Sequence, residues 1–294
     1  MSKNNQAHTP SPTTGDRGRA TRGAQAHRPR PSRRKGPSRG WVPDQHGAWM
    51  MVSIPAILGL VYGWSTPALT ILIPLVIAWY TGYFCFFAAG LWIKAAAKRK
   101  PDFLTPVLVY GAVCLAAAVC VLAQRPILVI WAAAFGPLVV IAVYEAWKKR
   151  PRSLASGEST VVASALLLPV MVMAAGKPIS EHLWAVTAVI GMYFCTSIPF
   201  VKTLIRNRGE RAYFIGSVAS HAVAVAVTAY VAAIGWIHWL AVVAMLCALA
   251  RAWWMPVHAE KNDMRWPPKK IGRIEIVFTV LVLIGVVLPP GLGL

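Results

Sequence analysis

The sequence predicts an all-α, polytopic transmembrane helix bundle of about nine spans, with a cytosolic N-terminus and a C-terminus outside. Hydrophobic residues make up 57% of the 294 residues and charged residues only 14%. Apolar runs recur along the chain, each near the ~20 residues that cross a ~30 Å hydrocarbon core. Because lipid supplies no hydrogen-bond partners, such runs must be helical. Lys and Arg residues, in contrast, gather in the N-terminal tail and in alternate loops.

Residues 1–40 are predicted to form a disordered, basic cytosolic tail, and residues 41–294 a transmembrane helical domain. The tail holds ten Lys and Arg residues and almost no large apolar side chains. It therefore cannot bury enough apolar surface to offset the entropy lost on ordering. We expect it to lie near anionic lipid head groups, where each Lys or Arg contributes ~1 kcal/mol of attraction.

Nine apolar runs follow the tail, and each is expected to form one spanning helix. Their approximate ranges are 47–64, 67–93, 103–123, 126–147, 158–175, 182–201, 212–233, 236–255 and 274–292. The first is short and contains Pro55, so whether it crosses fully is left open. Pro74, Pro137, Pro169 and Pro199 interrupt later runs, which is tolerated in membrane helices.

The positive charge supports this order of helices. With the tail inside, the loops near 94–102, 148–152, 202–211 and 251–273 are cytosolic. Together with the tail they hold 28 of the 30 Lys and Arg residues, and only Arg125 and Lys177 lie outside. This asymmetry follows the positive-inside rule. It accounts for the net charge of +20 without a nucleic-acid partner, and the short outer loops place any function within the bilayer or on the cytosolic face.

The cysteines give no sign of a metal or redox centre. All five lie in apolar runs without a CxxC pair, so we expect them to pack as small hydrophobic side chains. No metal site is predicted, and the sequence does not indicate a cofactor.

The segment from Trp41 to Trp49 joins the tail to the first helix. Asp44 suits a helix N-cap, and the two Trp residues suit the head-group region. His46 is not needed for capping. Asp44 and His46 are therefore candidates for acid–base catalysis or head-group binding at the cytosolic interface.

The run Pro43-Asp-Gln-His-Gly-Ala-Trp49 resembles the opening motif of the YwiC-like family of bacterial membrane proteins. The run Pro199-Phe-Val-Lys-Thr-Leu-Ile-Arg-Asn-Arg-Gly209 is similar to the second recognisable stretch of that family. The resemblance covers roughly residues 41–294. It implies a multi-pass protein of the bacterial cytoplasmic membrane, and it implies no particular activity.

Lys202, Arg206 and Arg208 follow the sixth run and form a candidate site for anions or head groups. Lys202 and Arg206 are one helical turn apart, with Thr203 beside them. Converging cations of this kind bind phosphate or carboxylate. The alternative is a solvated loop that contacts lipid phosphates without a defined site.

His221 lies near the middle of the seventh run, where an ionisable group suggests a function. Tyr213, Ser217 and Thr228 share its helix face, so a polar stripe is expected to point into the bundle. The alternative is a neutral histidine that links two helices. Glu158 and Glu275 are expected at helix N-termini, where the helix dipole favours a carboxylate.

Three functions remain open from the sequence. The first is an intramembrane enzyme that acts on a lipid-soluble substrate from the cytosolic face. Its topology would resemble that of the UbiA-type prenyltransferases, but the loops here lack the repeated Asp residues that hold Mg²⁺-diphosphate in those enzymes. The alternatives are a small-solute transporter and a non-catalytic membrane component.

Overall fold

The computed structural model describes residues 40–43, 46–150 and 152–291. Within these ranges the chain forms nine α-helices, two short 3-10 helices and no β-strand. The helices are α1 (His46–Gly63), α2 (Leu69–Lys94), η1 (Ala97–Arg99), α3 (Pro101–Gln124), η2 (Pro126–Trp131), α4 (Ala132–Trp147), α5 (Leu154–Ala174), α6 (Glu181–Ile205), α7 (Arg211–Ala233), α8 (Leu240–Lys261) and α9 (Pro268–Val287).

The predicted helical membrane bundle is confirmed. Seven helical segments in the described ranges are long and apolar enough to cross a membrane, namely α2, α3, η2 with α4, α5, α6, α7 and α8. The other two are α1, which is shorter, and α9, whose first turns carry several charges. The count of nine spans and the orientation of the termini remain predictions, and the tail expected over residues 1–40 lies almost entirely outside the described residues.

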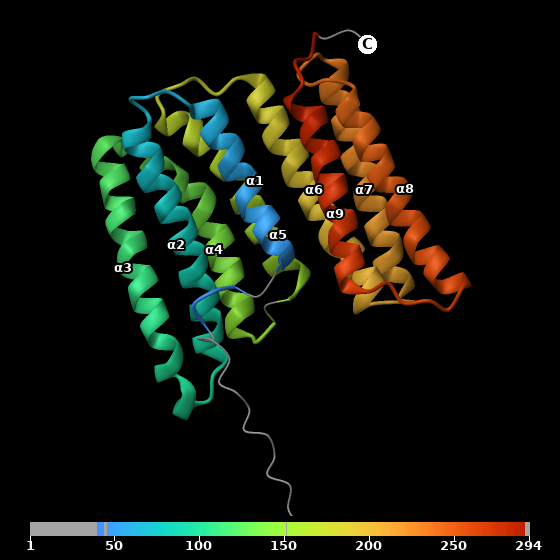
Figure 1. The fold of residues 1–294 in the computed structure, drawn as a ribbon, viewed down its shortest axis with the longest axis horizontal. Helices are drawn as coiled ribbons and strands as arrows, with labels where there is room; N and C mark the ends of the chain where they lie inside the picture. Colours follow the sequence, from blue (N-terminus) through green and yellow to red (C-terminus); the bar gives the residue numbers. More distant parts are fainter. Residues whose placement is uncertain (1–39, 44–45, 151, 292–294) are drawn as a thin grey trace, which may run out of the picture. The chain divides into compact units, whose positions relative to one another are not determined.

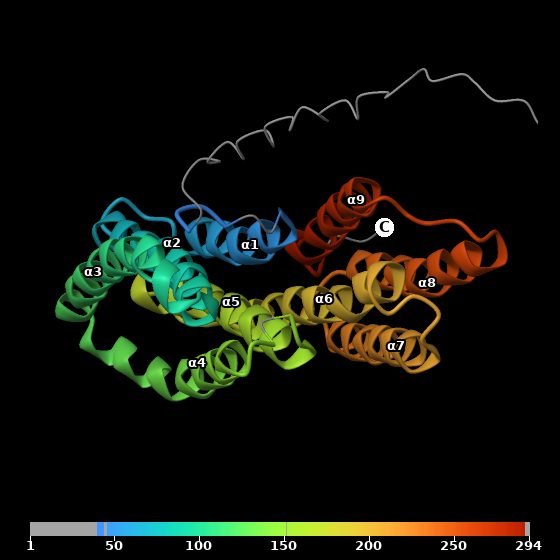
Figure 2. The same cartoon turned by 90° about the horizontal axis from the view of Figure 1, so that it is seen from below.

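Helices α5 and α6 occupy the middle of the described bundle (Figure 1). Helices α1 and α9 lie on one face of this central pair and α4 and α7 on the other, as Figure 2 shows. We call the end at which α2, α4, α6 and α8 finish the basic end, because the four predicted basic loops lie there. The opposite end is the short-loop end.

Small residues allow the central helices to approach closely. A Cβ added to Gly59 of α1 would meet the Met171 side chain of α5 at 2.5 Å. One added to Gly285 of α9 would lie 2.6 Å from the backbone of Ala241 at the start of α8. Small-residue interfaces of this kind are how membrane helices pack without a hydrophobic driving force between them.

Three helices differ from the predicted boundaries for local reasons. Helix α5 starts earlier because the Ser153 side chain accepts a hydrogen bond from the Ser156 N–H and caps it. Helix α9 starts earlier because Pro268 occupies its first turn, a favoured position for proline. Helix α8 continues through Pro256 to Lys261, which brings residues 251–261 out of the predicted loop.

The interrupting prolines do not break the helices. Pro55, Pro74, Pro137, Pro169 and Pro199 all lie inside continuous α-helices. They therefore give no support to unwound binding segments of the kind found in some transporters.

At the short-loop end, side chains join α1 to the later helices. Lys177 donates hydrogen bonds to the carbonyl oxygens of Tyr62 and Trp64 at 2.9 and 3.0 Å. His182 Nδ1 lies 2.8 Å from the Trp236 carbonyl oxygen, so its Nε2 is left to interact with the Tyr62 hydroxyl at 3.1 Å. Lys177, one of the two cations predicted on the outer side of the membrane, thus caps the C-terminus of α1.

Candidate functional site

Arg251 is buried inside the bundle, with 5% of its surface exposed. It lies on α8 about ten residues before the end of that helix, which is ~15 Å along the axis. Ala248, Ala252 and Met255 on the same side of α8 are also buried. A cation in such surroundings needs a partner, because its burial is otherwise very unfavourable.

Glu275 of α9 is the partner of Arg251. Arg251 Nη1 donates to Glu275 Oε1 at 2.5 Å. The Tyr193 hydroxyl of α6 lies 3.2 Å from the Glu275 carbonyl oxygen, 3.5 Å from Glu275 Oε2 and 3.2 Å from Thr279 Oγ1. Helices α6, α8 and α9 therefore share one buried polar network.

Two aromatic rings enclose the guanidinium of Arg251. Its Cζ lies 4.2 Å from the centroid of the Phe200 ring and 4.4 Å from that of Phe278. Such contacts are attractive, because the ring faces are electron-rich. With rings on its faces, the guanidinium can form hydrogen bonds only along its edges.

The Tyr193 hydroxyl also interacts with this guanidinium, and the remaining edge is formed by Nε and Nη2. Nε and Nη2 of Arg251 are buried and have no hydrogen-bond partner among the described residues. These two neighbouring N–H groups form the fork that binds two oxygens of a carboxylate or a phosphate. Buried donors without partners are rare and call for an explanation.

His221 of α7 belongs to the same region. It is fully buried, its ring meets Phe200 edge-on at 6.3 Å, and it interacts electrostatically with Arg251. Its Nδ1 lies 2.7 Å from the Ser217 carbonyl oxygen, which can only accept, so Nδ1 carries a hydrogen. Nε2 is buried and unpartnered among the described residues, and in the neutral ring it is an acceptor.

The predicted polar stripe on α7 is present. Ser217, His221 and Thr228 are all fully buried, and Tyr213 is half-buried. Of this stripe, His221 contacts the Phe200 ring that covers Arg251. His221 is therefore near a functional candidate, and its own role as a catalytic residue, a hypothesis from its ionisable side chain within a span, stays a prediction.

The sequence analysis did not identify Arg251 and Glu275 as site residues. Arg251 was counted with the cytosolic loop 251–273, although the predicted run 236–255 also included it, and Glu275 was expected at a helix N-terminus. The structure corrects both placements, since Arg251 is within α8 and Glu275 lies seven residues into α9. A signal was present, because Arg251 is the only charged residue between positions 236 and 259.

The second pair of predicted site residues cannot be placed. Asp44 lies outside the described residues, and only the backbone of His46, as the first residue of α1, is described. Their roles at the interface stay predictions.

The three predicted anion-binding cations do not form one group. Arg208 donates to Asp263 Oδ1 at 3.2 Å and to the Ala259 carbonyl oxygen at 3.3 Å, so it joins α6 to the end of α8. Lys202 and Arg206 interact electrostatically with each other. Thr203 is buried and donates to the Phe200 carbonyl oxygen, which removes it from the surface.

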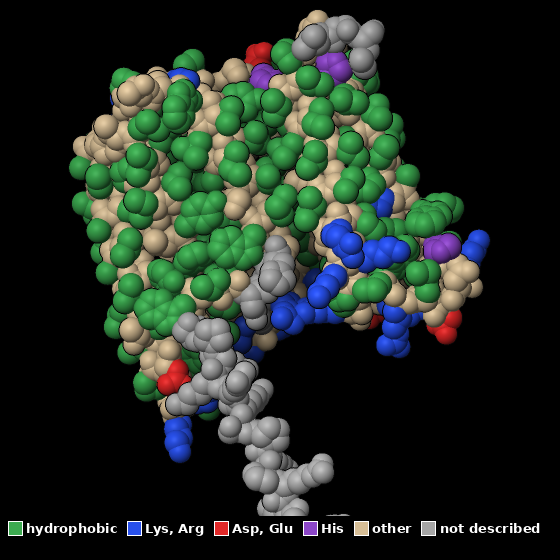
Figure 3. Space-filling model, viewed as in Figure 1, with side chains coloured by type: hydrophobic (Ala, Val, Ile, Leu, Met, Phe, Trp, Pro, Cys, Tyr) green, Lys and Arg blue, Asp and Glu red, His purple; other side chains and the backbone are tan. Residues whose placement is uncertain are grey.

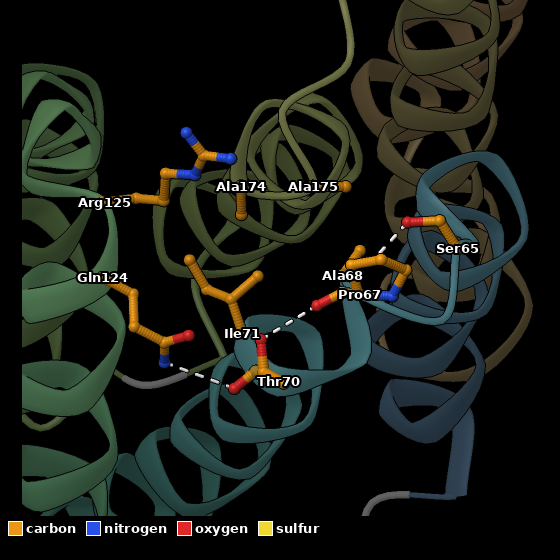
Figure 4. Close-up of a pocket in the computed structure, with 9 residues that line it drawn as sticks. All are labelled: Ser65, Pro67, Ala68, Thr70, Ile71, Gln124, Arg125, Ala174 and Ala175. Carbon is orange, nitrogen blue, oxygen red and sulfur yellow. Dashed lines mark hydrogen bonds between the residues drawn. The ribbon is translucent and has the colours of Figure 1, made fainter.

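A separate cavity of about 330 Å³ lies at the short-loop end (Figure 4). It is lined by residues of the α1–α2 loop and α2, the end of α3 and the end of α5. Gln124 at its edge donates to the Thr70 carbonyl oxygen at 3.2 Å. Its lining cation, Arg125, is exposed to solvent, so this cavity has no buried cation of the kind found at Arg251. Among the described residues, no three His, Cys, Asp or Glu side chains gather as metal ligands would.

Comparisons with known proteins identify a family that the chain resembles. The family model described as YwiC-like protein matches residues 42–172. The chain is 28% identical over 242 residues to the uncharacterized protein YwiC of Bacillus subtilis (strain 168), which covers 80% of this chain and 92% of that relative. The resemblance to the YwiC-like family is confirmed. No solved structure matches. The match to the family model ends within α5, before the Arg251 network, whereas the similarity to the Bacillus subtilis protein extends over most of the chain.

Proposed function

We propose that this multi-pass membrane protein binds a small carboxylate-class anion at Arg251 and carries it across the bacterial cytoplasmic membrane together with a proton. One observation carries the proposal: Nε and Nη2 of the buried Arg251 have no partner among the described residues. Ionisable groups inside membrane helices commonly mark substrate paths or proton relays.

The open edge of Arg251 favours an anion with two adjacent oxygens. A guanidinium binds carboxylate or phosphate through two parallel N–H bonds, which adds geometric selectivity to charge attraction. The Phe200 and Phe278 rings cover its faces and exclude water from them. His221 Nε2 can accept one hydrogen bond from a hydroxyl of the same ligand or from a water molecule.

Charge balance predicts that a proton accompanies the anion. Arg251 and Glu275 form a neutral pair, so a bound monoanion would leave one uncompensated negative charge in the interior. Such a charge is strongly disfavoured where water is scarce. Protonation of Glu275 or His221 restores neutrality, and either group lies close enough to Arg251 to respond to the anion.

The depth of the network favours transport over the intramembrane enzyme. His221, Arg251 and Tyr193 are about 10 to 12 residues from the basic ends of their helices, or ~15–18 Å. An enzyme with UbiA-like topology would act at the cytosolic ends of the helices. A purely structural role gives no reason for unpaired buried donors, because apolar side chains of similar volume would pack at least as stably.

Proteoliposomes test the proposal directly. Slowly permeating carboxylates such as gluconate and malate would be offered, with phosphate for comparison. Their uptake should exceed the uptake by protein-free vesicles. It should increase when the vesicle lumen is more alkaline than the external solution. Binding to the detergent-purified protein should be lost in Arg251→Lys, which keeps the charge but not the planar fork. Lys269→Gln, with an exposed side chain at the basic end, is the control.

Two outcomes would reject the proposal. One is that no carboxylate in the panel binds or is taken up above the Arg251→Lys background. The other is that Arg251→Lys and Lys269→Gln behave alike. Turnover of a lipid-soluble substrate by the protein in vesicles, without net anion movement, would instead support the enzyme.

A further inference from the structure

Four cationic side chains come together at the basic end, and they come from separate segments. Lys94 ends α2, Arg152 precedes the cap of α5, Lys202 lies in the last turn of α6, and Arg206 follows that helix. Lys94 interacts electrostatically with Arg152, Arg152 with Arg206, and Arg206 with Lys202. We call these four residues the cation cluster.

Close packing of α5 against α6 holds the cluster together. A Cβ on Gly157 would lie 2.9 Å from the Ile198 side chain, so the first turn of α5 rests against the last turns of α6. Arg152 stands immediately before that first turn. The N-terminus of α5, where the helix dipole is positive, therefore faces the same region. Lys and Arg side chains gather along a hollow at the lower edge of the molecule in Figure 3.

Among the described residues, the four positive charges of the cluster face a single interacting carboxylate and form no ion pair. The ion pairs found among the described residues involve Arg150, Arg208 and Arg251, and none involves the cluster. Glu158 is the acidic side chain that interacts with Lys202. Burial and the neighbouring charge of Arg152 lower the pKa of the Arg206 guanidinium, as expected where like charges are crowded.

We propose that the cation cluster is a binding site for a phosphate group, either the head group of an anionic lipid or a soluble phosphate ester. Four converging cations and a helix N-terminus are the elements that proteins use for phosphate. This site offers several cationic side chains, whereas Arg251 offers a single buried pair of N–H groups. The site stands independently of the proposed transport, because its residues are exposed or half-buried at the basic end.

The cluster differs from a general basic surface in its composition. Arg208 is adjacent in sequence but is paired with Asp263, so it does not belong to the site. Lys94 and Arg152, which the sequence placed in other loops, do belong. A bound phosphate would join the end of α2 and the start of α5 to the end of α6, and it would relieve repulsion among all four side chains.

The full-length protein, purified and stripped of lipid, tests this site. We would titrate phosphatidylglycerol, phosphatidylcholine, glycerol 3-phosphate and inorganic phosphate, and follow binding by native mass spectrometry and by thermal unfolding. Phosphatidylglycerol should bind at least tenfold more tightly than phosphatidylcholine and raise the unfolding temperature. Binding of glycerol 3-phosphate as well would assign a soluble phosphate ester, whereas binding of the lipid alone would assign a head group.

A pair of matched double variants separates the site from general charge. Arg152→Gln with Arg206→Gln should weaken phosphatidylglycerol or phosphate binding at least tenfold. Lys261→Gln with Arg265→Gln removes the same charge from exposed side chains at the same end and should leave binding within about twofold. Because like charges repel, the first double variant should also unfold at a temperature no lower than that of the ligand-free wild type.

The proposed site would be rejected if the two double variants lost ligand binding to the same extent. It would also be rejected if phosphatidylglycerol and phosphatidylcholine bound equally and neither soluble phosphate bound. If the first double variant does not fold, Arg206→Gln alone carries the test. Loss of phosphate binding would leave gluconate uptake at Arg251 intact, so failure of one proposal is distinguishable from failure of the other.

Discussion

Arg251 is a charged side chain that is stably buried and still keeps hydrogen-bond donors unused, a combination that is rare inside proteins. Its charge is matched by Glu275 and its faces are covered by Phe200 and Phe278, so the side chain is tolerated in the interior. Nevertheless, two of its donors stay unused. A residue kept only for stability would have its donors satisfied, whereas a residue that binds a ligand needs donors in reserve.

The pH dependence of binding depends on Glu275. In the wild type, uptake of one proton with each anion should weaken binding about tenfold for each unit by which the pH rises, by linkage. Glu275→Gln removes the charge that the proton neutralises, so the affinity should become nearly independent of pH. Isothermal titration of gluconate, which has a single carboxylate, between pH 5.5 and 8 measures both slopes. Glu260→Gln, at the exposed end of α8, should behave as the wild type, and an unchanged slope in Glu275→Gln would contradict proton coupling through this residue.

Unfolding stability gives a separate test of the pair. Glu275→Leu leaves Arg251 buried without a counterion, and this should destabilise the protein by ~3–5 kcal/mol. Adding Arg251→Met removes the orphaned charge, so the double variant should recover most of that loss. Chemical or thermal unfolding in detergent provides the measurement. Additive losses from the two single substitutions would mean that the two side chains do not act as a pair.

At the scale of the helix, the sequence predicted what hydropathy and length determine. Each apolar run became one helix, because a segment in lipid must satisfy its own hydrogen bonds. The pairing of α8 with α9 through Arg251 and Glu275 could not be predicted, since it depends on which helix faces meet. The predicted eighth run ended at residue 255, whereas α8 continues through Pro256 to Lys261, so Arg251 lies near the middle of the helix and not at its end.

The close approach of α1 to α5 depends on Gly59. Gly59→Ala would place a Cβ 2.5 Å from the Sδ atom of Met171, so we expect a loss of ~1–3 kcal/mol from overpacking. Gly90→Ala is the matched control, because that position in α2 has open space around it and alanine favours the helix. The unfolding temperature should therefore fall for Gly59→Ala and should stay the same or rise for Gly90→Ala. Equal shifts would show that α1 does not pack on α5 through this glycine.

At the scale of the whole chain, the two candidate sites occupy different parts of the molecule. The Arg251 network is formed by α6 to α9, whereas the cation cluster draws on α2, the start of α5 and the end of α6. The YwiC-like match over residues 42–172 includes Lys94 and Arg152 but not Arg251 or Glu275. A site at the basic end and a mid-depth site are consistent with the proposed movement of an anion through the C-terminal helices.

The topology of the whole chain rests on α1 and α9, the two helices outside the seven that clearly suit a membrane. Their lengths of 18 and 20 residues correspond to ~27 and ~30 Å, which is enough for a ~30 Å hydrocarbon core. We therefore expect both to cross.

Reporter fusions at the N-terminus and within the Lys98 loop should then report the cytosol, and a fusion at the C-terminus should report the opposite side. Substituted cysteines at Lys98 and at Lys177 provide the matched control, since they should label from opposite sides. A C-terminus on the side of Lys98 would show that α9 does not cross, and an N-terminus on the side of Lys177 would show the same for α1. The first result would also alter the transport proposal, because Glu275 would then lie on a helix with both ends at one surface.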